Sequence, residues 1–332
     1  MPAKSAPFRG PILLHVWSIA RELLTRKIDM LDVPALAAQA GFQGVEWLDR
    51  LMPSFEPAFW EKLASAQEKA GLEASAFSLS LELTASPQSI AAQKDRAQAI
   101  IGLCPRLGVQ ALRVGIGGGA RLSMARLMAL TQAGAGEPGP LNALGRSLYK
   151  LMLSLPRPVK RAGARADAMA LQSAAWSLQP LARQAAGLGI LLGVENHFGL
   201  TSHAEDLLTL LDLIAGEENS QGLHENQDAG WAARSPLSPL AGGGVGACLD
   251  TGNYPQGVDP GKAAALLAPR AVHVHWKLKS IPPADEERRV LAMHAEYLKA
   301  AGYGGAFSVE YEGKVGCLAG AKAGLELLRE LY

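Results

Sequence analysis

One repeated pattern constrains the fold of this chain more than any other feature. An alanine-rich, helix-like segment ends in glycine and is followed at once by an apolar run of strand length, near Gly41, Gly71, Gly108, Gly187 and Gly302. Glycine just past a helix end adopts the left-handed conformation that closes the helix. Strands that alternate with helices pair in parallel through right-handed crossovers. The pattern therefore predicts an α/β protein built on a parallel sheet.

The number of strands sharpens this prediction. Strand-length apolar runs occupy residues 12–17, 43–47, 73–79, 110–114, 190–195, 245–250, 271–276 and 306–311. Eight strand–helix units predict a closed (β/α)8 TIM barrel, with residues 1–332 as a single domain. With 332 residues, 48% of them hydrophobic, the chain is long enough to bury such a core.

Two intervals between strands are too long for a plain strand–helix unit, and we interpret residues 115–166 and 216–243 as loop insertions. The first has helical apolar spacing and, apart from Glu137, only basic charged residues: Arg121, Arg126, Arg146, Lys150, Arg157, Lys160, Arg161 and Arg165. We favour a solvated or oligomer-forming helical hairpin over a lid that attracts an anionic substrate. A homo-oligomer formed through this insertion is one possible partner arrangement. The second insertion is polar and rich in turn residues, which is typical of a surface loop.

Composition excludes several classes of partner. The net charge is +1, so no overall field recruits nucleic acid or a membrane surface. Three cysteines without metal-like spacing fit free thiols in a reducing cytoplasm. Lys4 and Arg9 precede an apolar run that loosely resembles a signal peptide, but its histidine and tryptophan favour a first barrel strand. No stretch reaches the roughly 18 apolar residues of a membrane span. We predict a cytoplasmic protein.

Four metal-binding side chains end four successive strand-like runs in the C-terminal half: Glu195, Asp250, His275 and Glu310. Parallel barrels draw their catalytic groups from the carboxyl ends of the strands, so these four are expected to converge at one mouth. Carboxylates and imidazole are suitable ligands for Mn²⁺, Mg²⁺, Co²⁺ or Zn²⁺. The sequence therefore predicts a metal-dependent barrel enzyme with one divalent metal ion.

The segments ENHFGLTS, CLDTGNYP, VHVHWK and SVEYEG resemble the sugar phosphate isomerase/epimerase superfamily of xylose isomerase-like TIM barrels. The resemblance covers nearly the whole chain outside the two insertions. By matching position it implies that Glu195, Asp250, His275 and Glu310 are the metal ligands of an enzyme of carbohydrate metabolism. His273 points to the same side of its strand, but the second histidine of the pattern is the one that matches.

The resemblance also implies a mechanism. In ketose epimerases of this family the metal binds two neighbouring oxygens of the sugar. The glutamates that match Glu195 and Glu310 flank the sugar and exchange the proton between its two faces. The predicted function is a divalent-metal-dependent isomerase or epimerase acting on a sugar, sugar phosphate or polyol through a metal-stabilised enediolate. His197 is a further candidate acid or base, and Lys277 resembles a family lysine able to polarise a carbonyl.

Three departures from the epimerase pattern leave the reaction open. Asn253 stands where those enzymes have a histidine, and Ile281 where they have an arginine. The substrate-binding glutamate expected after Glu195 is absent as well. A dehydratase or β-eliminating lyase acting on a keto-sugar or inosose is therefore an alternative. DNA repair of the endonuclease IV kind and a non-catalytic binding barrel are less favoured alternatives.

Three further features have a less specific interpretation. Glu46, which closes the second strand, is either an acid at the barrel mouth or a structural partner for an arginine. His15 on the first strand is interpreted as a packed core histidine. The glycines from Gly115 onward match neither a dinucleotide-binding nor a Walker pattern, and we interpret them as backbone room at a strand end.

Overall fold

The computed structural model describes residues 10–83, 86–116, 164–216, 244–313 and 316–332. Eight parallel strands form a closed barrel in sequence order, and the first strand pairs with the last. The strands are β1 (Ile12–His15), β2 (Gly44–Leu48), β3 (Ala74–Leu81), β4 (Val109–Ile116), β5 (Leu191–Glu195), β6 (Val245–Asp250), β7 (Ala271–Leu278) and β8 (Phe307–Tyr311). The predicted (β/α)8 barrel is confirmed.

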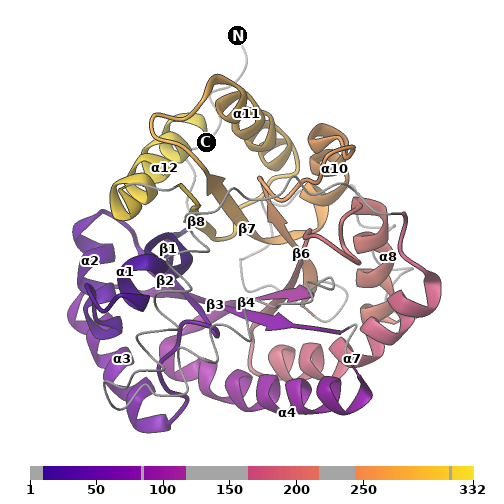
Figure 1. The fold of residues 1–332 in the computed structure, drawn as a ribbon, viewed down its shortest axis with the longest axis horizontal. Helices are drawn as coiled ribbons and strands as arrows, with labels where there is room; N and C mark the ends of the chain where they lie inside the picture. The colour runs from indigo at the N-terminus through magenta and orange to yellow at the C-terminus, as the bar shows by residue number, and fades with distance from the viewer. Residues whose placement is uncertain (1–9, 84–85, 117–163, 217–243, 314–315) are drawn as a thin grey trace.

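A ring of helices surrounds the barrel, as Figure 1 shows in a view close to the barrel axis. The described α-helices are α1 (Ala20–Leu24), α2 (Val33–Gln39), α3 (Pro57–Lys69), α4 (Pro87–Leu103), α7 (Ala168–Gly187), α8 (Ala204–Ala215), α10 (Pro260–Leu267), α11 (Asp285–Ala300) and α12 (Cys317–Leu331). None of these described helices combines the length and apolar character that crossing a membrane requires.

The glycine pattern that predicted the fold ends the helices as expected, with one shift. Gly41, Gly71 and Gly302 follow α2, α3 and α11 with φ values of +91°, +68° and +67°. Gly187, in contrast, is the last residue of α7, and Gly189 takes the left-handed conformation there, at φ +72°. Only glycine adopts such angles without strain, so these positions terminate the helices before each strand.

Two layers of apolar side chains fill the barrel and its surroundings. The larger one lies between strands and helices and includes Trp47, Trp60 and Phe77, all fully buried. Trp60 stacks on Phe77 with ring centroids 5.4 Å apart. Burying side chains of this size contributes roughly 1.5–3 kcal/mol each. A smaller cluster of Leu13, Ala74, Ala76 and Ala111 fills the interior of the barrel. The polar side chains of the candidate site lie nearer the carboxyl ends of the barrel strands.

Most of the two predicted insertions lies outside the described residues. The first begins later than predicted, because Gly115 and Ile116 still belong to β4. Its far end is fixed to α8, where Asp206 accepts hydrogen bonds from Arg165 Nε at 2.7 Å and Ala166 N at 2.9 Å. Residues 117–163 and 217–243, and with them the predicted hairpin and surface loop, are not among those described.

Candidate active site

The structure brings the four residues predicted from strand ends into one cluster. Glu195, Asp250, His275 and Glu310 come from β5, β6, β7 and β8, and each is at most 6% exposed. His275 Nδ1 lies 3.1 Å from Glu195 Oε1, 3.7 Å from Asp250 Oδ2 and 3.4 Å from Glu310 Oε2. One imidazole nitrogen thus faces three carboxylates from three neighbouring strands.

The three separations from His275 Nδ1 are those expected between ligands of a shared ion, and Glu195, Asp250 and His275 place ligand-type atoms within 4.8 Å of one another. Atoms that share a zinc-sized ion at about 2.1 Å in a tetrahedral site lie about 3.4 Å apart. In addition, His275 Nδ1 is buried and has no hydrogen-bond partner among the described residues. Buried polar atoms without a partner are rare and need an explanation. A divalent cation fits the donor set and would supply a partner for His275 Nδ1.

Charge balance points the same way. Four buried carboxylates, those of Glu46, Glu195, Asp250 and Glu310, surround the cluster. Two cations pair with them: Arg113 with Glu195, and Lys277 with Asp250 at 2.9 Å. With the histidines neutral, two negative charges are left over. Burial would lower the pKa of His275, but without a cation Cys248 and Glu46 raise it well above its ordinary value. Uncompensated buried charge is costly, and one divalent cation would neutralise it.

Glu46 on β2 orients the ring of His275. His275 Nε2 lies 3.0 Å from Glu46 Oε1 and 3.2 Å from Oε2, so its N–H donates to the carboxylate and leaves the lone pair on Nδ1. Ser78 and His273 also bond this carboxylate, at 2.5 and 2.8 Å. Burial would raise the pKa of Glu46, but His275, His15 and His273 hold it well below its ordinary value. Its described partners are therefore histidines and a serine, not the arginine considered above.

His273 lies one layer deeper in the barrel than His275. Its Nε2 is 2.8 Å from Glu46 Oε2 and 3.0 Å from Ser308 Oγ. These are hydrogen-bond lengths, shorter than the separations around His275 Nδ1. The contacts of His273 are thus those of a support beneath the cluster.

Lys277 reaches the cluster from β7. Its Nζ lies 2.9 Å from Asp250 Oδ2, 3.3 Å from Glu310 Oε2 and 3.0 Å from Asn253 Oδ1. Gly252 makes room for it, since a Cβ there would stand 2.9 Å from Lys277 Cδ. Burial would lower the pKa of Lys277, but Asp250, Glu310 and Glu312 raise it well above its ordinary value. Lys277 is therefore a cation aimed at the same carboxylate oxygens as His275.

Arg113 on β4 is a site residue that the sequence analysis missed. Its Nη2 forms an ion pair with Glu195 Oε2. Burial would raise the pKa of Glu195, but Arg113 and then His197 keep it well below its ordinary value. A Cβ on Gly115 would lie 2.6 Å from the Arg113 guanidinium. The backbone room inferred at this glycine is therefore occupied by the side chain of Arg113. The sequence signal that could have identified Arg113 is a charged residue in the middle of the apolar strand segment ALRVG.

His197 stands at the edge of the cluster rather than inside it. Its Nε2 lies 3.9 Å from Glu195 Oε2, and its side chain is 31% exposed. Burial lowers the pKa of His197, which favours the neutral ring. The neighbouring Asn196, also missed from sequence, donates to the Asp250 carbonyl at 2.9 Å and accepts from its amide at 2.7 Å. These bonds fix the end of β6 to the end of β5.

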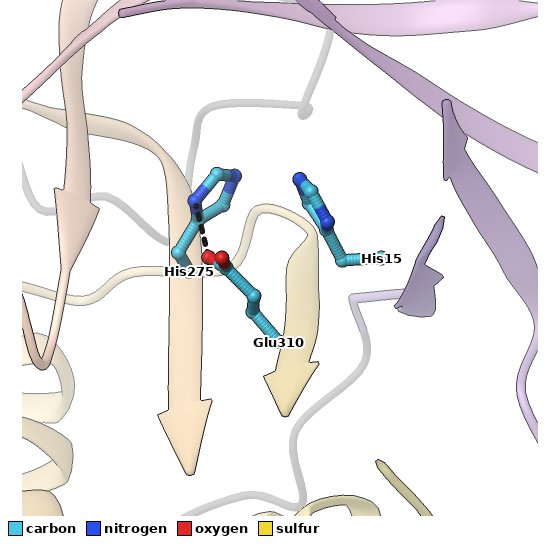
Figure 2. A group of neighbouring side chains, drawn as sticks. All are labelled: His15, His275 and Glu310. Atoms are coloured by element: carbon cyan, nitrogen blue, oxygen red, sulfur yellow. Dashed lines mark ion pairs between the residues drawn. The ribbon is translucent and has the colours of Figure 1, made fainter. Parts of the chain in front are cut away.

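His15 completes the group, as Figure 2 shows. It is 3% exposed, so the predicted burial is confirmed. Its surroundings, however, are those of the site. The ring packs edge-on against the ring of His275 at a centroid distance of 4.9 Å, and His15, His275 and Glu310 each place a ligand-type atom within 4.8 Å of the others. β1 also ends at His15, short of the predicted residue 17, because Val16–Ile19 form a 3-10 helix.

The fold and the cluster define a class: (β/α)8 barrels with an acidic, histidine-containing site at the carboxyl ends of the strands. No family model matches the chain, and no curated protein matches its sequence.

Several solved structures share the whole fold. D-allulose 3-epimerase from Methylomonas sp. in complex with D-allulose matches with a TM-score of 0.57 and 14% identity, covering 98% of each chain. A D-psicose 3-epimerase from Clostridium cellulolyticum H10 with D-tagatose matches at 0.60 and 12%, over 97% of this chain and 99% of that one. The probable 3-DHS dehydratase AsbF from Bacillus anthracis matches at 0.57 and 14%, over 96% and 98%. These similarities confirm the (β/α)8 fold that the resemblance implied.

Proposed function

We propose that this protein is a divalent-metal-dependent isomerase or epimerase that acts on a sugar, sugar phosphate or polyol by proton transfer through an enediolate. One observation carries the proposal: a buried imidazole nitrogen without a hydrogen-bond partner faces three carboxylates, in a cluster of four buried carboxylates with two cationic side chains. A site of this composition at the carboxyl end of a barrel is suited to hold a cation and move a proton beside it.

Glu195, Asp250, His275 and Glu310 are the residues that would hold the ion. Carboxylate and imidazole donors suit Mn²⁺, Mg²⁺, Co²⁺ and Zn²⁺, so the donor set alone does not select among these metals. When bound, the ion supplies Lewis-acid stabilisation of negative charge on the substrate oxygens beside the reacting carbon.

Glu310 is the side chain best placed to act as the base. Glu195 forms an ion pair with Arg113, whereas Glu310 lies 3.3 Å from the ammonium of Lys277. In the proposed reaction a Glu310 oxygen accepts the proton from the carbon next to the carbonyl. In isomerisation Glu310 returns that proton to the neighbouring carbon. In epimerisation Glu195 supplies a proton to the opposite face of the same carbon, and exchange with solvent resets the two carboxyl groups. Lys277 Nζ–H donates to an adjacent substrate oxygen and opposes the charge that develops there.

The similar structures narrow the first substrates to try. Structures of 3-epimerases among them contain D-allulose or D-tagatose, or were determined in the presence of D-fructose. The test incubates the purified, metal-loaded protein with each ketohexose in deuterium oxide and measures deuterium on carbon by mass spectrometry. The proposal predicts incorporation that depends on added metal. A protein that binds metal but exchanges no carbon-bound proton, across ketoses, ketose phosphates and oxidised polyols, would contradict it.

Dehydration is the second candidate, and the position of Lys277 favours it specifically. The ammonium lies within 3.3 Å of both Asp250 Oδ2 and Glu310 Oε2, so an acid stands beside the proposed base. Glu310 would take the proton next to a ketone while the hydroxyl on the following carbon leaves as water, protonated by Lys277. The product is an unsaturated ketone. Ultraviolet absorbance that appears without deuterium exchange into recovered substrate distinguishes this reaction from epimerisation.

A further inference from the structure

His15 has a position in the barrel that the proposed reaction does not yet use. It is the last residue of β1, where the register pairs it with Glu46 of β2. On its other side β1 pairs with β8 through Leu14 and Val309, which places His15 level with Glu310. Figure 2 shows the carboxylate of Glu310 beside the rings of both His15 and His275. His15 therefore borders the reacting side of the site.

The backbone fixes which nitrogen of His15 carries the proton. The amide of Trp17 donates a hydrogen bond to His15 Nδ1 at 3.0 Å, at the start of the 3-10 helix that follows β1. A nitrogen that accepts a hydrogen bond carries no proton, so the neutral ring has its N–H at Nε2.

The Nε2–H of His15 has no acceptor at hydrogen-bond distance among the described contacts. Its recorded partner is Glu46 Oε1 at 3.6 Å, too long for a hydrogen bond. The Glu46 oxygens already accept from Ser78, His273 and His275. The ring of His15 is 3% exposed, its N–H has a fixed direction, and the oxygens of Glu46 beside it already accept other hydrogen bonds. The N–H is therefore placed to donate to an acceptor supplied from outside the protein.

We propose that His15 is a catalytic residue that donates its Nε2–H to the substrate oxygen on which charge develops when Glu310 removes the proton. This inference rests on the proposed function and adds to it an electrophile from the opposite side of the barrel. The carbon–hydrogen electron pair becomes a carbon–carbon double bond, and the carbonyl pair moves to oxygen. Glu310 takes up the proton, and carbon regains one as the double bond is lost, so nothing is oxidised or reduced. Neutral imidazole donors stabilise such oxyanions because they are oriented before the charge appears.

A matched pair of substitutions separates this role from simple packing. His15→Asn keeps an acceptor for the Trp17 amide and loses the distal donor. His15→Gln keeps a donor near Nε2 and loses the cap on Trp17. The proposal predicts that His15→Asn lowers kcat by about 100- to 1,000-fold, as the loss of one oriented oxyanion donor does, whereas His15→Gln stays within about tenfold of wild type. A packing role predicts the reverse order, in melting temperature and activity together. Ser18→Ala, which removes a buried hydroxyl bonded to Val309 O, is the control for local destabilisation.

A second readout does not depend on turnover. ¹⁵N NMR of histidine-labelled full-length protein, metal-free and loaded with Mg²⁺, reports the tautomer of His15, which is assigned by the signal missing from His15→Gln. We expect a neutral ring with its proton on Nε2. A proton on Nδ1 overturns the inference whatever the activity.

The outcomes also separate this inference from the proposed function. Deuterium exchange by wild type together with unchanged exchange by His15→Asn would overturn the role of His15 and leave the proposed function standing. Binding of metal without exchange in any substrate would overturn the proposed function, and the role of His15 with it. Exchange by wild type and His15→Gln, with loss in His15→Asn at unchanged metal content, supports both.

Discussion

The barrel mouth contains two polar layers that differ in how their atoms are satisfied. The mouth layer consists of Glu195, Asp250, Glu310, Lys277 and the Nδ1 side of His275, and the separations around Nδ1 are 3.1–3.7 Å. The deep layer consists of Glu46, Ser78, His273 and Ser308, joined by contacts of 2.5–3.0 Å. Both oxygens of Glu46 at the centre of the deep layer accept hydrogen bonds from the protein, and His273 Nδ1 is the deep-layer atom that lacks a partner among the described residues. In the mouth layer the atom without a partner, His275 Nδ1, faces three carboxylates. This difference indicates that the deep layer is a support and the mouth layer a binding site.

His275 belongs to both layers. Its Nε2 bonds Glu46 below, while its Nδ1 faces the three carboxylates above. Partners that orient a ligating histidine in this way fix its tautomer and raise its basicity. The comparison therefore predicts that changes in the two layers have different signatures. Mouth-layer changes cost function with little effect on folding, and deep-layer changes cost both or only stability.

The largest effect is expected for Glu310→Gln. The change removes the proposed base at constant size, so turnover should fall by about 100- to 10,000-fold. The melting temperature of the metal-free protein should stay close to that of wild type, because the change also relieves repulsion among the carboxylates. Deuterium exchange and thermal melts, measured side by side, check both statements. Wild-type turnover by this variant would remove Glu310 from the mechanism.

An intermediate effect is expected for Glu46→Gln in the deep layer. The carboxamide no longer enforces the tautomer of His275, and loss of such a partner lowers metal affinity by about 10- to 100-fold. Because a buried, hydrogen-bonded group is altered, the variant should also lose about 1–3 kcal/mol of stability. Metal titration by calorimetry and urea unfolding measure the two quantities. Unchanged metal affinity alongside lost stability would show that the two layers are not coupled through His275.

The smallest effect is expected for Ser308→Ala. The hydroxyl bonds only His273 among the recorded contacts, and His273 keeps its bond to Glu46. The loss should be about 1 kcal/mol in urea unfolding, with metal affinity unchanged. Arg106→Ala, which removes an exposed ion pair with Glu61, is a surface control expected to cost less. A large drop in metal affinity for Ser308→Ala would contradict the assignment of Ser308 to a supporting layer separate from the metal site.

The strand ends show how much of the site the sequence contains. Glu195, Asp250, His275 and Glu310 could be placed because each follows an apolar run, and the carboxyl ends of parallel strands must share one face. Lys277 and His197 could be found by their distance of two residues from such an end.

The missed residues have a different physical origin. Arg113 and His15 lie within runs that read as ordinary strands, and their importance comes from long-range pairing across the barrel. The contact of Arg113 with Glu195 spans 82 residues, and that of His275 with Glu46 spans 229. The 3-10 turn that sets the tautomer of His15 has no distinct sequence signal. Pairing partners depend on barrel closure and register, which the local pattern does not specify.

Metal content is the most direct test of the mouth layer as a binding site. Wild type and Asp250→Asn are purified side by side, stripped with chelator, reloaded separately with Mn²⁺, Co²⁺, Zn²⁺ or Mg²⁺, and analysed for bound metal after desalting. Asparagine keeps the oxygen that accepts from the Gly252 amide at 2.7 Å, so the strand end should remain folded. The account predicts about one divalent ion per wild-type chain and loss of that ion in the variant. Wild type that retains none of these metals, or a variant that retains as much as wild type, would contradict it.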